Sequence, residues 1–293
     1  MAVDAPGVRR LLQANETAKK KGLSAVVGYQ RRFQPGYEAV IAKIQGGAIG
    51  QVSRLEAFWK GGQVWVQKRP DLEAKLGRQL TEMEFQLRNW IHFTWLSGGI
   101  VLDPLGHNLD VCNWIMRMPP QSVRATSARK EFVSNAYGDG ADFFSAEYTY
   151  PSGVKMSAES YRLTGKPGKV AEIAYGTKGI AECNNSTITD PAGNPLWSYS
   201  PASTVNSCQR EQDLFIESIR SGKPLNMIEE SANTDLTAIM GRTAAALGRE
   251  VTRKEMLAST ETFFPGGSLT WGTAPPTLPD KLGDYQWPAR GRL

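Results

Sequence analysis

The chain has 293 residues, of which 41% are hydrophobic and 22% charged, so it is long enough to bury a core without disulfides. The net charge is +5, but the basic runs are short and interleaved with acidic residues, and no nucleic-acid-binding motif accompanies them, so we predict no nucleic-acid partner. Three widely spaced cysteines and the lack of a long apolar run argue against a disulfide framework and a membrane span.

The first segment reads as a helix followed directly by a buried strand. Val8, Leu11, Leu12 and Ala18 share one helical face, and the helix ends before Gly22. The apolar run at residues 25–29 then predicts a short buried strand. A helix leading directly into a buried strand is one αβ unit of a parallel sheet, so we interpret this segment as part of such a sheet.

The next segments alternate between helix and strand. Pro35 suits the first turn of a helix that continues to residue 45, and residues 52–59 predict a strand. Residues 61–88 are polar and irregular, so we expect a long loop with a helical turn or two. From about Ile100 the pattern predicts a helix that ends at Met118, before two prolines.

Residues 122–184 predict a run of closely connected strands, at 122–132, 142–150, 154–162, 170–175 and 179–184. Strands joined by such short turns are expected to be antiparallel. Two helices follow, at 209–220 and 232–247, and a Pro- and Gly-rich tail from residue 264 is expected to be extended. The predicted class is α+β: a large open antiparallel sheet with helices on one face, preceded by the αβ unit.

The densest cluster of reactive side chains is Asp103, His107 and Asp110. If the segment is helical, these residues lie on one face, and a carboxylate one turn from an imidazole can orient it and raise its basicity. The only other histidine, His92, has no such neighbours. Two alternatives stay open: Asp103 is a helix cap with Pro104 at the first helical position and His107 an interior histidine, or Asp103 and His107 bind a metal.

Three motifs follow one another along the chain: Gln30, Arg32, Phe33 and Pro35, the Gly-Ala-Ile-Gly turn at 47–50, and the Asp-x-x-x-His-x-x-Asp motif at 103–110. These motifs and the order of the segments resemble the Gfo/Idh/MocA oxidoreductases. The turn at 176–179, the Ser-Gly-Lys-Pro at 221–224 and the last helix also fit this family. The Glu84–Gly98 segment and Asn108 are similar to a branch of the family that often carries an export signal.

The resemblance implies roles for individual residues. His107 corresponds to the general acid/base that exchanges a proton with a sugar hydroxyl, and Asp103 to the acid that tunes it. The implied substrate-binding residues are Arg32, Trp90, Trp95, Asn108 and Asp110, and those facing the cofactor are Gln30 and Arg31. The two tryptophans serve equally well as core aromatics. No metal-binding residue is implied.

Two features of the family are missing from the sequence. There is no G-x-G-x-x-G between a strand and a helix, and Gly138-Asp139-Gly140 does not replace it. The family's Glu-Lys-Pro motif would lie just before Ala2. We therefore interpret residues 1–34 as the remnant of a dinucleotide-binding Rossmann domain and residues 35–293 as a substrate-binding and oligomerisation domain, in a chain truncated at its N-terminus.

The resemblance implies an NAD- or NADP-dependent dehydrogenase of sugars or cyclitols, with His107 as general acid/base and with little competence as this chain alone. The alternatives are a non-catalytic sugar-binding or interaction protein that reuses the substrate domain, and a metal-assisted lyase or hydrolase using Asp103 and His107. We expect a homo-oligomer that pairs through the open sheet face and has no membrane association. A cytoplasmic location is expected, or export to the periplasm if a signal lies upstream of Met1.

Overall fold

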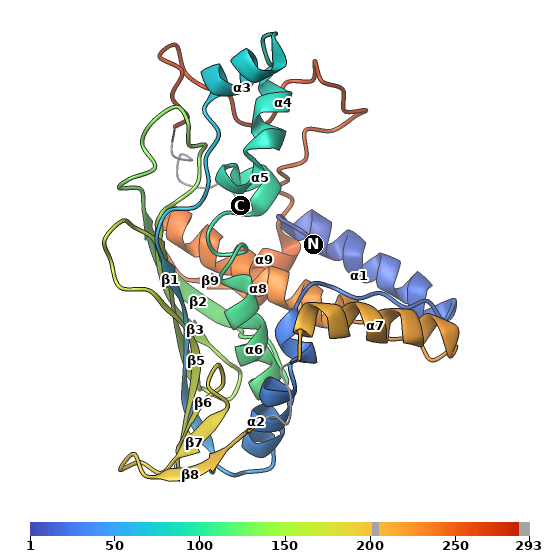
Figure 1. The fold of residues 1–293 in the computed structure, drawn as a ribbon, viewed down its shortest axis with the longest axis vertical. Coiled ribbons are helices and arrows are strands. Elements are labelled where there is room, and N and C mark those ends of the chain that lie inside the picture. Colours follow the sequence, from blue (N-terminus) through green and yellow to red (C-terminus); the bar gives the residue numbers. More distant parts are fainter. Residues whose placement is uncertain (201–204, 287–293) are drawn as a thin grey trace.

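A computed structural model of the chain describes residues 1–200 and 205–286. Figure 1 shows one large sheet seen nearly edge-on, with helices gathered on one of its sides. This arrangement confirms the predicted α+β class. No helix in the part of the chain that the structure describes is long and apolar enough to cross a membrane.

The sheet has nine strands in the order β8-β7-β6-β5-β1-β4-β3-β2-β9. Their bounds are β1 Val52–Gly61, β2 Ser122–Ala128, β3 Phe143–Thr149, β4 Lys155–Arg162, β5 Lys169–Gly176, β6 Ile180–Glu182, β7 Thr187–Thr189, β8 Pro195–Ser198 and β9 Val251–Thr252. The strands of the run at 122–184 pair antiparallel with one another, as predicted, whereas β1, which precedes this run, lies parallel to β4. The chain between these two strands is long enough for the crossover that a parallel pair requires.

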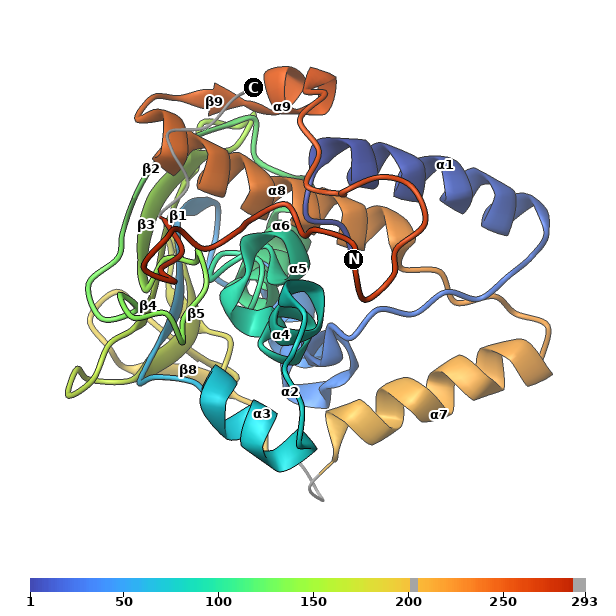
Figure 2. The same cartoon turned by 90° about the horizontal axis from the view of Figure 1, so that it is seen from above.

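The helices cover one face of this sheet. Their bounds are α1 Ala5–Lys20, α2 Pro35–Gln45, α3 Arg69–Leu76, α4 Glu82–Arg88, α5 Thr94–Ser97, α6 Gly106–Met116, α7 Ser207–Arg220, α8 Ile228–Leu247 and α9 Arg253–Ala258, with short 3₁₀ helices at Gln30–Phe33 and Trp90–His92. Figures 1 and 2 agree that α6 and α8 lie next to the sheet and that α1 and α7 lie farther out. The segment at residues 61–88, predicted as a long loop with a helical turn or two, contains the two helices α3 and α4.

Two predictions near the site were wrong. Residues 25–29 do not form a buried strand, since the segment makes a single parallel bridge, from Ala25 to Asn226, and no other described strand pairs with it. The helix predicted from Ile100 begins only at Gly106, and residues 100–105 are turns. Asp103 is therefore neither on the face of α6 nor its N-cap, a position that Leu105 holds.

Alternation along the strands explains the main core. Leu55 and Ala57 of β1, and Met156 and Ala158 of β4, are buried and face the helices. Helix α8 approaches the sheet closely at Gly241, where an added Cβ would lie 2.1 Å from the Tyr148 hydroxyl. A smaller second core joins α3, α4 and α5 to the C-terminal tail.

Candidate active site

The first turn of α6 places His107 against aromatic side chains from two other segments. Its ring centroid lies 5.9 Å from that of Trp59, at an interplanar angle of 31°. Tyr29 meets the same ring edge-on at 5.7 Å. Trp59 points toward the helices because it shares the inward alternation of Leu55 and Ala57 on β1. His107 is therefore held between the end of β1 and the segment that precedes the first 3₁₀ helix.

The surroundings of His107 favour the neutral imidazole. Burial, together with the positive charge of Arg31, lowers its pKa to about 4, and Asp103 opposes this effect. The Nδ1 atom of His107 is buried and has no hydrogen-bond partner among the described residues. The ring as a whole is half-buried, so a ligand hydroxyl would approach it at an edge other than that of Nδ1.

Asp103 lies in the turn before α6 and is paired with an arginine that sequence reasoning missed. Arg162 Nη2 donates to the Asp103 carbonyl oxygen at 2.9 Å and to its carboxylate Oδ2 at 3.2 Å. Arg162 is buried at the inward end of β4, whereas the Asp103 side chain is 36% exposed. The turn itself begins with Gly98 and Gly99, which both have positive φ angles that only glycine adopts readily. In the sequence, the sign of this pairing is that Arg162 occupies an inward-facing position of the predicted strand at 154–162.

A buried carboxylate lies beneath the site, and sequence reasoning missed it too. Glu172 of β5 is fully buried, and burial raises its pKa. It accepts hydrogen bonds from Arg31 Nη1 at 2.5 Å, from the Tyr37 hydroxyl at 3.0 Å and from Asn108 Nδ2 at 2.6 Å. Asn108 also donates to the Phe58 carbonyl oxygen at 3.0 Å. Glu172 therefore connects the predicted residues Arg31 and Asn108 to the sheet.

A second ion pair joins Arg32 to Asp110. Arg32 Nε and Nη2 donate to the two carboxylate oxygens of Asp110 at 2.7 and 2.9 Å, and Thr234 of α8 donates to the same carboxylate at 3.1 Å. Asp110 is buried, and burial raises its pKa against the opposing effect of Arg32. This two-point contact fixes the 3₁₀ helix that carries Arg31 against α6. The substrate-binding roles of Arg32 and Asp110 stay predictions.

The predicted tryptophans lie in other surroundings. Trp95 is buried in the second core, where its indole N–H donates to Gln86 Oε1 at 2.7 Å. Trp90 is 42% exposed and its ring centroid lies 6.4 Å from that of Trp65. No described ring contact joins either tryptophan to His107, so their stacking on a sugar stays a prediction. Gln30 is half-buried in the first 3₁₀ helix, next to Arg31.

His92, the other histidine, and Asp235 of α8 each make contacts that hold parts of the fold together. His92 has a ring nitrogen 2.9 Å from the Trp65 carbonyl oxygen, and burial lowers its pKa to about 4. The Tyr29 hydroxyl donates to Asp235 of α8 at 3.4 Å, and Asp235 also accepts from the backbone N–H of Ala2 at 2.9 Å. The start of the chain is thus tied to the same residues that flank His107.

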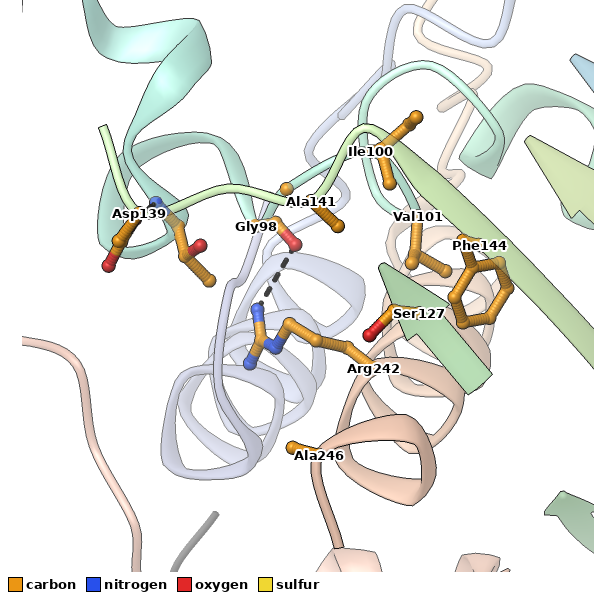
Figure 3. Close-up of a pocket in the computed structure, with 11 residues that line it drawn as sticks. Gly98, Ile100, Val101, Ser127, Asp139, Ala141, Phe144, Arg242 and Ala246 are labelled. Atoms are coloured by element: carbon orange, nitrogen blue, oxygen red, sulfur yellow. Dashed lines mark hydrogen bonds between the residues drawn. The ribbon is translucent and has the colours of Figure 1, made fainter. Parts of the chain in front are cut away.

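A small enclosed cavity lies apart from His107. Figure 3 shows it between the Gly98 turn, strands β2 and β3, and Arg242 of α8, and its volume is about 60 Å³, enough for a few water molecules. Arg242 donates to the Gly98 carbonyl oxygen at 3.3 Å and to that of Val3 at 2.6 Å, and burial lowers its pKa to about 10.

No group of three or more potential metal ligands is found among residues 1–200 and 205–286.

The fold and part of the sequence match known proteins. Residues 37–182 match a family model described as the GFO/IDH/MocA C-terminal domain. An inositol 2-dehydrogenase of Rhizobium meliloti (strain 1021) is 26% identical over 267 residues, which cover 87% of this chain and 70% of that protein.

Two solved structures illustrate the shared fold. An aldose-aldose oxidoreductase from Caulobacter crescentus, complexed with glycerol, has a TM-score of 0.66 at 19% identity, over 86% of this chain and 70% of its own. A scyllo-inositol dehydrogenase from Lactobacillus casei, with bound NAD(H) and scyllo-inositol, has a TM-score of 0.59 at 16% identity, over 84% and 70%.

Proposed function

We propose that this chain, which belongs to the Gfo/Idh/MocA family, carries the substrate-binding and proton-transfer site of an oxidoreductase that acts on a hydroxyl group of a sugar or cyclitol. The observation that carries the proposal is the environment of His107: a half-buried, neutral imidazole next to the paired Asp103 and Arg162. The names of the relatives, inositol 2-dehydrogenase and scyllo-inositol dehydrogenase, support a polyol as substrate.

In this mechanism the residues of the chain handle the proton. The substrate hydroxyl donates to His107, whose neutral ring takes the proton as the carbon is oxidised to a carbonyl. Asp103 lies close enough to stabilise the imidazolium that forms, and Arg162 holds its carboxylate in place. The chemistry that a nicotinamide supplies when bound is acceptance of the hydride from the same carbon.

The residues of the chain fit the nicotinamide end of such a cofactor better than they fit its pyrophosphate. The half-buried side chains of His107 and Gln30 suit a substrate and a nicotinamide ribose, and we retain Gln30 and Arg31 as the residues that face the cofactor. The printed sequence contains no G-x-G-x-x-G turn to hold a pyrophosphate. We therefore expect the 293-residue chain alone to be a poor dehydrogenase, whether the cofactor is NAD or NADP.

The arrangement of domains and subunits is part of the same proposal. We retain residues 1–34 as part of a dinucleotide-binding domain and residues 35–293 as the substrate and assembly domain. One face of the sheet carries no helix in Figure 1, and we propose that copies of the chain pair through this face. A second candidate, a sugar-binding protein without catalysis, is favoured only by the missing pyrophosphate loop.

The test is turnover by the product of the whole open reading frame, with a panel of cyclitols and aldoses and with NAD⁺ or NADP⁺, followed as absorbance of the reduced nicotinamide. We expect His107→Gln to lower the rate by about two or more orders of magnitude, as loss of a general acid/base does. His92→Gln is the matched control, because His92 lies among aromatic side chains of other loops. Near-wild-type turnover in His107→Gln would refute the assigned role, and turnover of no polyol would favour the sugar-binding alternative.

A further inference from the structure

We propose that Trp65 and Trp90 form an outer sugar-binding site, so that the substrate is a glycoside or short oligosaccharide whose reacting ring lies at His107 and whose next ring lies on this aromatic pair. The proposal deepens the function proposed above and rests on it. It adds Trp65, Gln63 and Tyr137 to the residues that contact the substrate, and it narrows the substrate class to sugars of more than one ring.

Two large aromatic side chains meet at the surface of the segment between β1 and α6. Trp65 is 46% exposed and Trp90 is 42% exposed, and their ring centroids lie 6.4 Å apart at an interplanar angle of 62°. Single exposed apolar residues are common on protein surfaces, whereas adjoining exposed aromatic rings are typical of binding surfaces. Two rings at such an angle offer a ligand one ring face to stack on and a second ring beside it.

The two tryptophans are held in place by a buried amide. Asn89, which precedes Trp90, is fully buried. Its Oδ1 accepts from the Gln67 backbone N–H at 2.9 Å, and its Nδ2 donates to the Gln67 carbonyl oxygen at 2.9 Å. This reciprocal pair joins the segment that carries Trp65 to the segment that carries Trp90. The aromatic surface is therefore preformed, which reduces the conformational entropy lost when a ligand binds.

The polar groups next to the pair fit the hydroxyls of a sugar. Gln63, two positions before Trp65, donates to Glu131 Oε2 at 2.9 Å and accepts from the Tyr137 hydroxyl at 3.2 Å. Thr164 donates to the Glu131 carboxylate through its N–H at 3.0 Å and its hydroxyl at 2.8 Å. A sugar ring has apolar C–H faces and hydroxyls around its edge, so it matches an aromatic surface bordered by amide, hydroxyl and carboxylate groups. The carboxylate disfavours an anionic ligand.

One stretch of chain connects this surface to His107. The ring of Trp59, near the end of β1, lies 5.9 Å from the His107 ring, and Trp65 follows six positions later. Six residues span at most about 20 Å when fully extended, and an oligosaccharide of a few rings bridges a distance of this order. Between them, Gly61 pairs in register with Arg162, which forms the ion pair of the candidate active site. The outer surface is therefore continuous with the reacting site.

Calorimetry with the 293-residue chain tests the proposal without cofactor or turnover. The probes are glucose, maltose, cellobiose and the trisaccharides maltotriose and cellotriose. The variants Trp65→Ala and Trp90→Ala each remove one ring of the pair, and Trp65→Phe keeps an aromatic face. The matched control is Trp271→Ala, because Trp271 is 61% exposed and lies in the C-terminal tail, where it lines a different surface with Leu269.

We expect at least one of the glycans to bind about ten-fold or more tightly than glucose, and Trp65→Ala and Trp90→Ala each to abolish this advantage without changing the affinity for glucose. Trp65→Phe should retain most of the advantage and Trp271→Ala all of it. If no glycan binds more tightly than glucose, or if Trp271→Ala weakens glycan binding as much as Trp65→Ala does, the proposal fails. Equal losses for glucose and glycans in Trp65→Ala would mean that the pair is only structural, and would also refute it.

The same titrations distinguish the outer site from the function proposed above. His107→Gln should weaken the binding of glucose and of the glycans alike, because it removes a contact with the reacting ring. Glycan binding that depends on the two tryptophans but not on His107 would support the outer site and refute the proposed function. Glucose binding that depends on His107, with no preference for glycans, would refute the outer site and leave the proposed function standing.

Discussion

Replacing Glu172 with alanine removes the acceptor for three buried donors at once. Arg31, Tyr37 and Asn108 all donate to this carboxylate, and the Arg31 guanidinium has no other carboxylate within 4.0 Å among the described ion pairs. The substitution therefore leaves an uncompensated charge in the interior, which is more costly than the loss of a neutral hydrogen bond.

The expected cost is about 3–5 kcal/mol of unfolding free energy, the range for removing one partner of a buried ion pair. With an unfolding entropy of roughly 0.6 kcal/mol/K for a chain of this length, the melting temperature should fall by about 5–8 °C. Thermal melts followed by circular dichroism, with urea titrations in parallel, measure both quantities.

Glu172→Gln serves as the control for shape, because an amide oxygen can still accept from Tyr37 and Asn108. It should lose less stability than Glu172→Ala, and combining it with Arg31→Met should recover part of the loss because no lone charge remains. A melting temperature for Glu172→Ala within about one degree of wild type would refute the reasoning, since it would mean that water or another group satisfies Arg31 without cost.

Three other predictions concern acid stability, cofactor binding and assembly. Both histidines have pKa values of about 4 in the folded chain, which is below the value in the unfolded chain. As the pH falls, protons therefore bind the unfolded chain first and the folded state loses stability. Urea titrations should show a loss of about 2 kcal/mol of unfolding free energy per histidine between pH 7 and 5, and a smaller total loss in His92→Gln. Calorimetry should detect no NAD(H) binding by the 293-residue chain. Micromolar binding would contradict this prediction, because it would mean that the phosphates of NAD(H) bind without a glycine-rich turn. Light scattering should show a homo-oligomer, and a monomer would contradict pairing through the open sheet face.

Elements governed by local periodicity were predictable from the sequence. The apolar spacing after Pro35, and that within α7 and α8, gave helices whose observed bounds differ by a few residues. The strands at 143–149 and 155–162 followed from alternation and turn residues in the same way. The predicted catalytic pair also lies together, since both Asp103 and His107 flank the start of α6.

Features set by contacts distant in the chain were not predictable. Arg31 pairs with Glu172, which lies 141 positions away in the sequence, and no local pattern indicates such a partner. The turn before α6 is held by Arg162 at Asp103 and by Arg242 at Gly98, so helical periodicity wrongly extended the helix back to residue 100. The run at 25–29 has the composition of a strand, but within the described residues it finds only Asn226 to pair with.

The central claim is that a polyol hydroxyl binds against His107, and the histidine NMR signals of the 293-residue chain test it most directly. Titrating myo-inositol, scyllo-inositol and glucose, with and without NAD⁺, should shift the His107 ring signals saturably and leave those of His92 in place. Asp103→Asn should weaken the response, because the substitution removes the carboxylate charge that acts on His107. If no polyol shifts His107 up to its solubility limit, the imidazole is not the site of substrate binding and the account is contradicted.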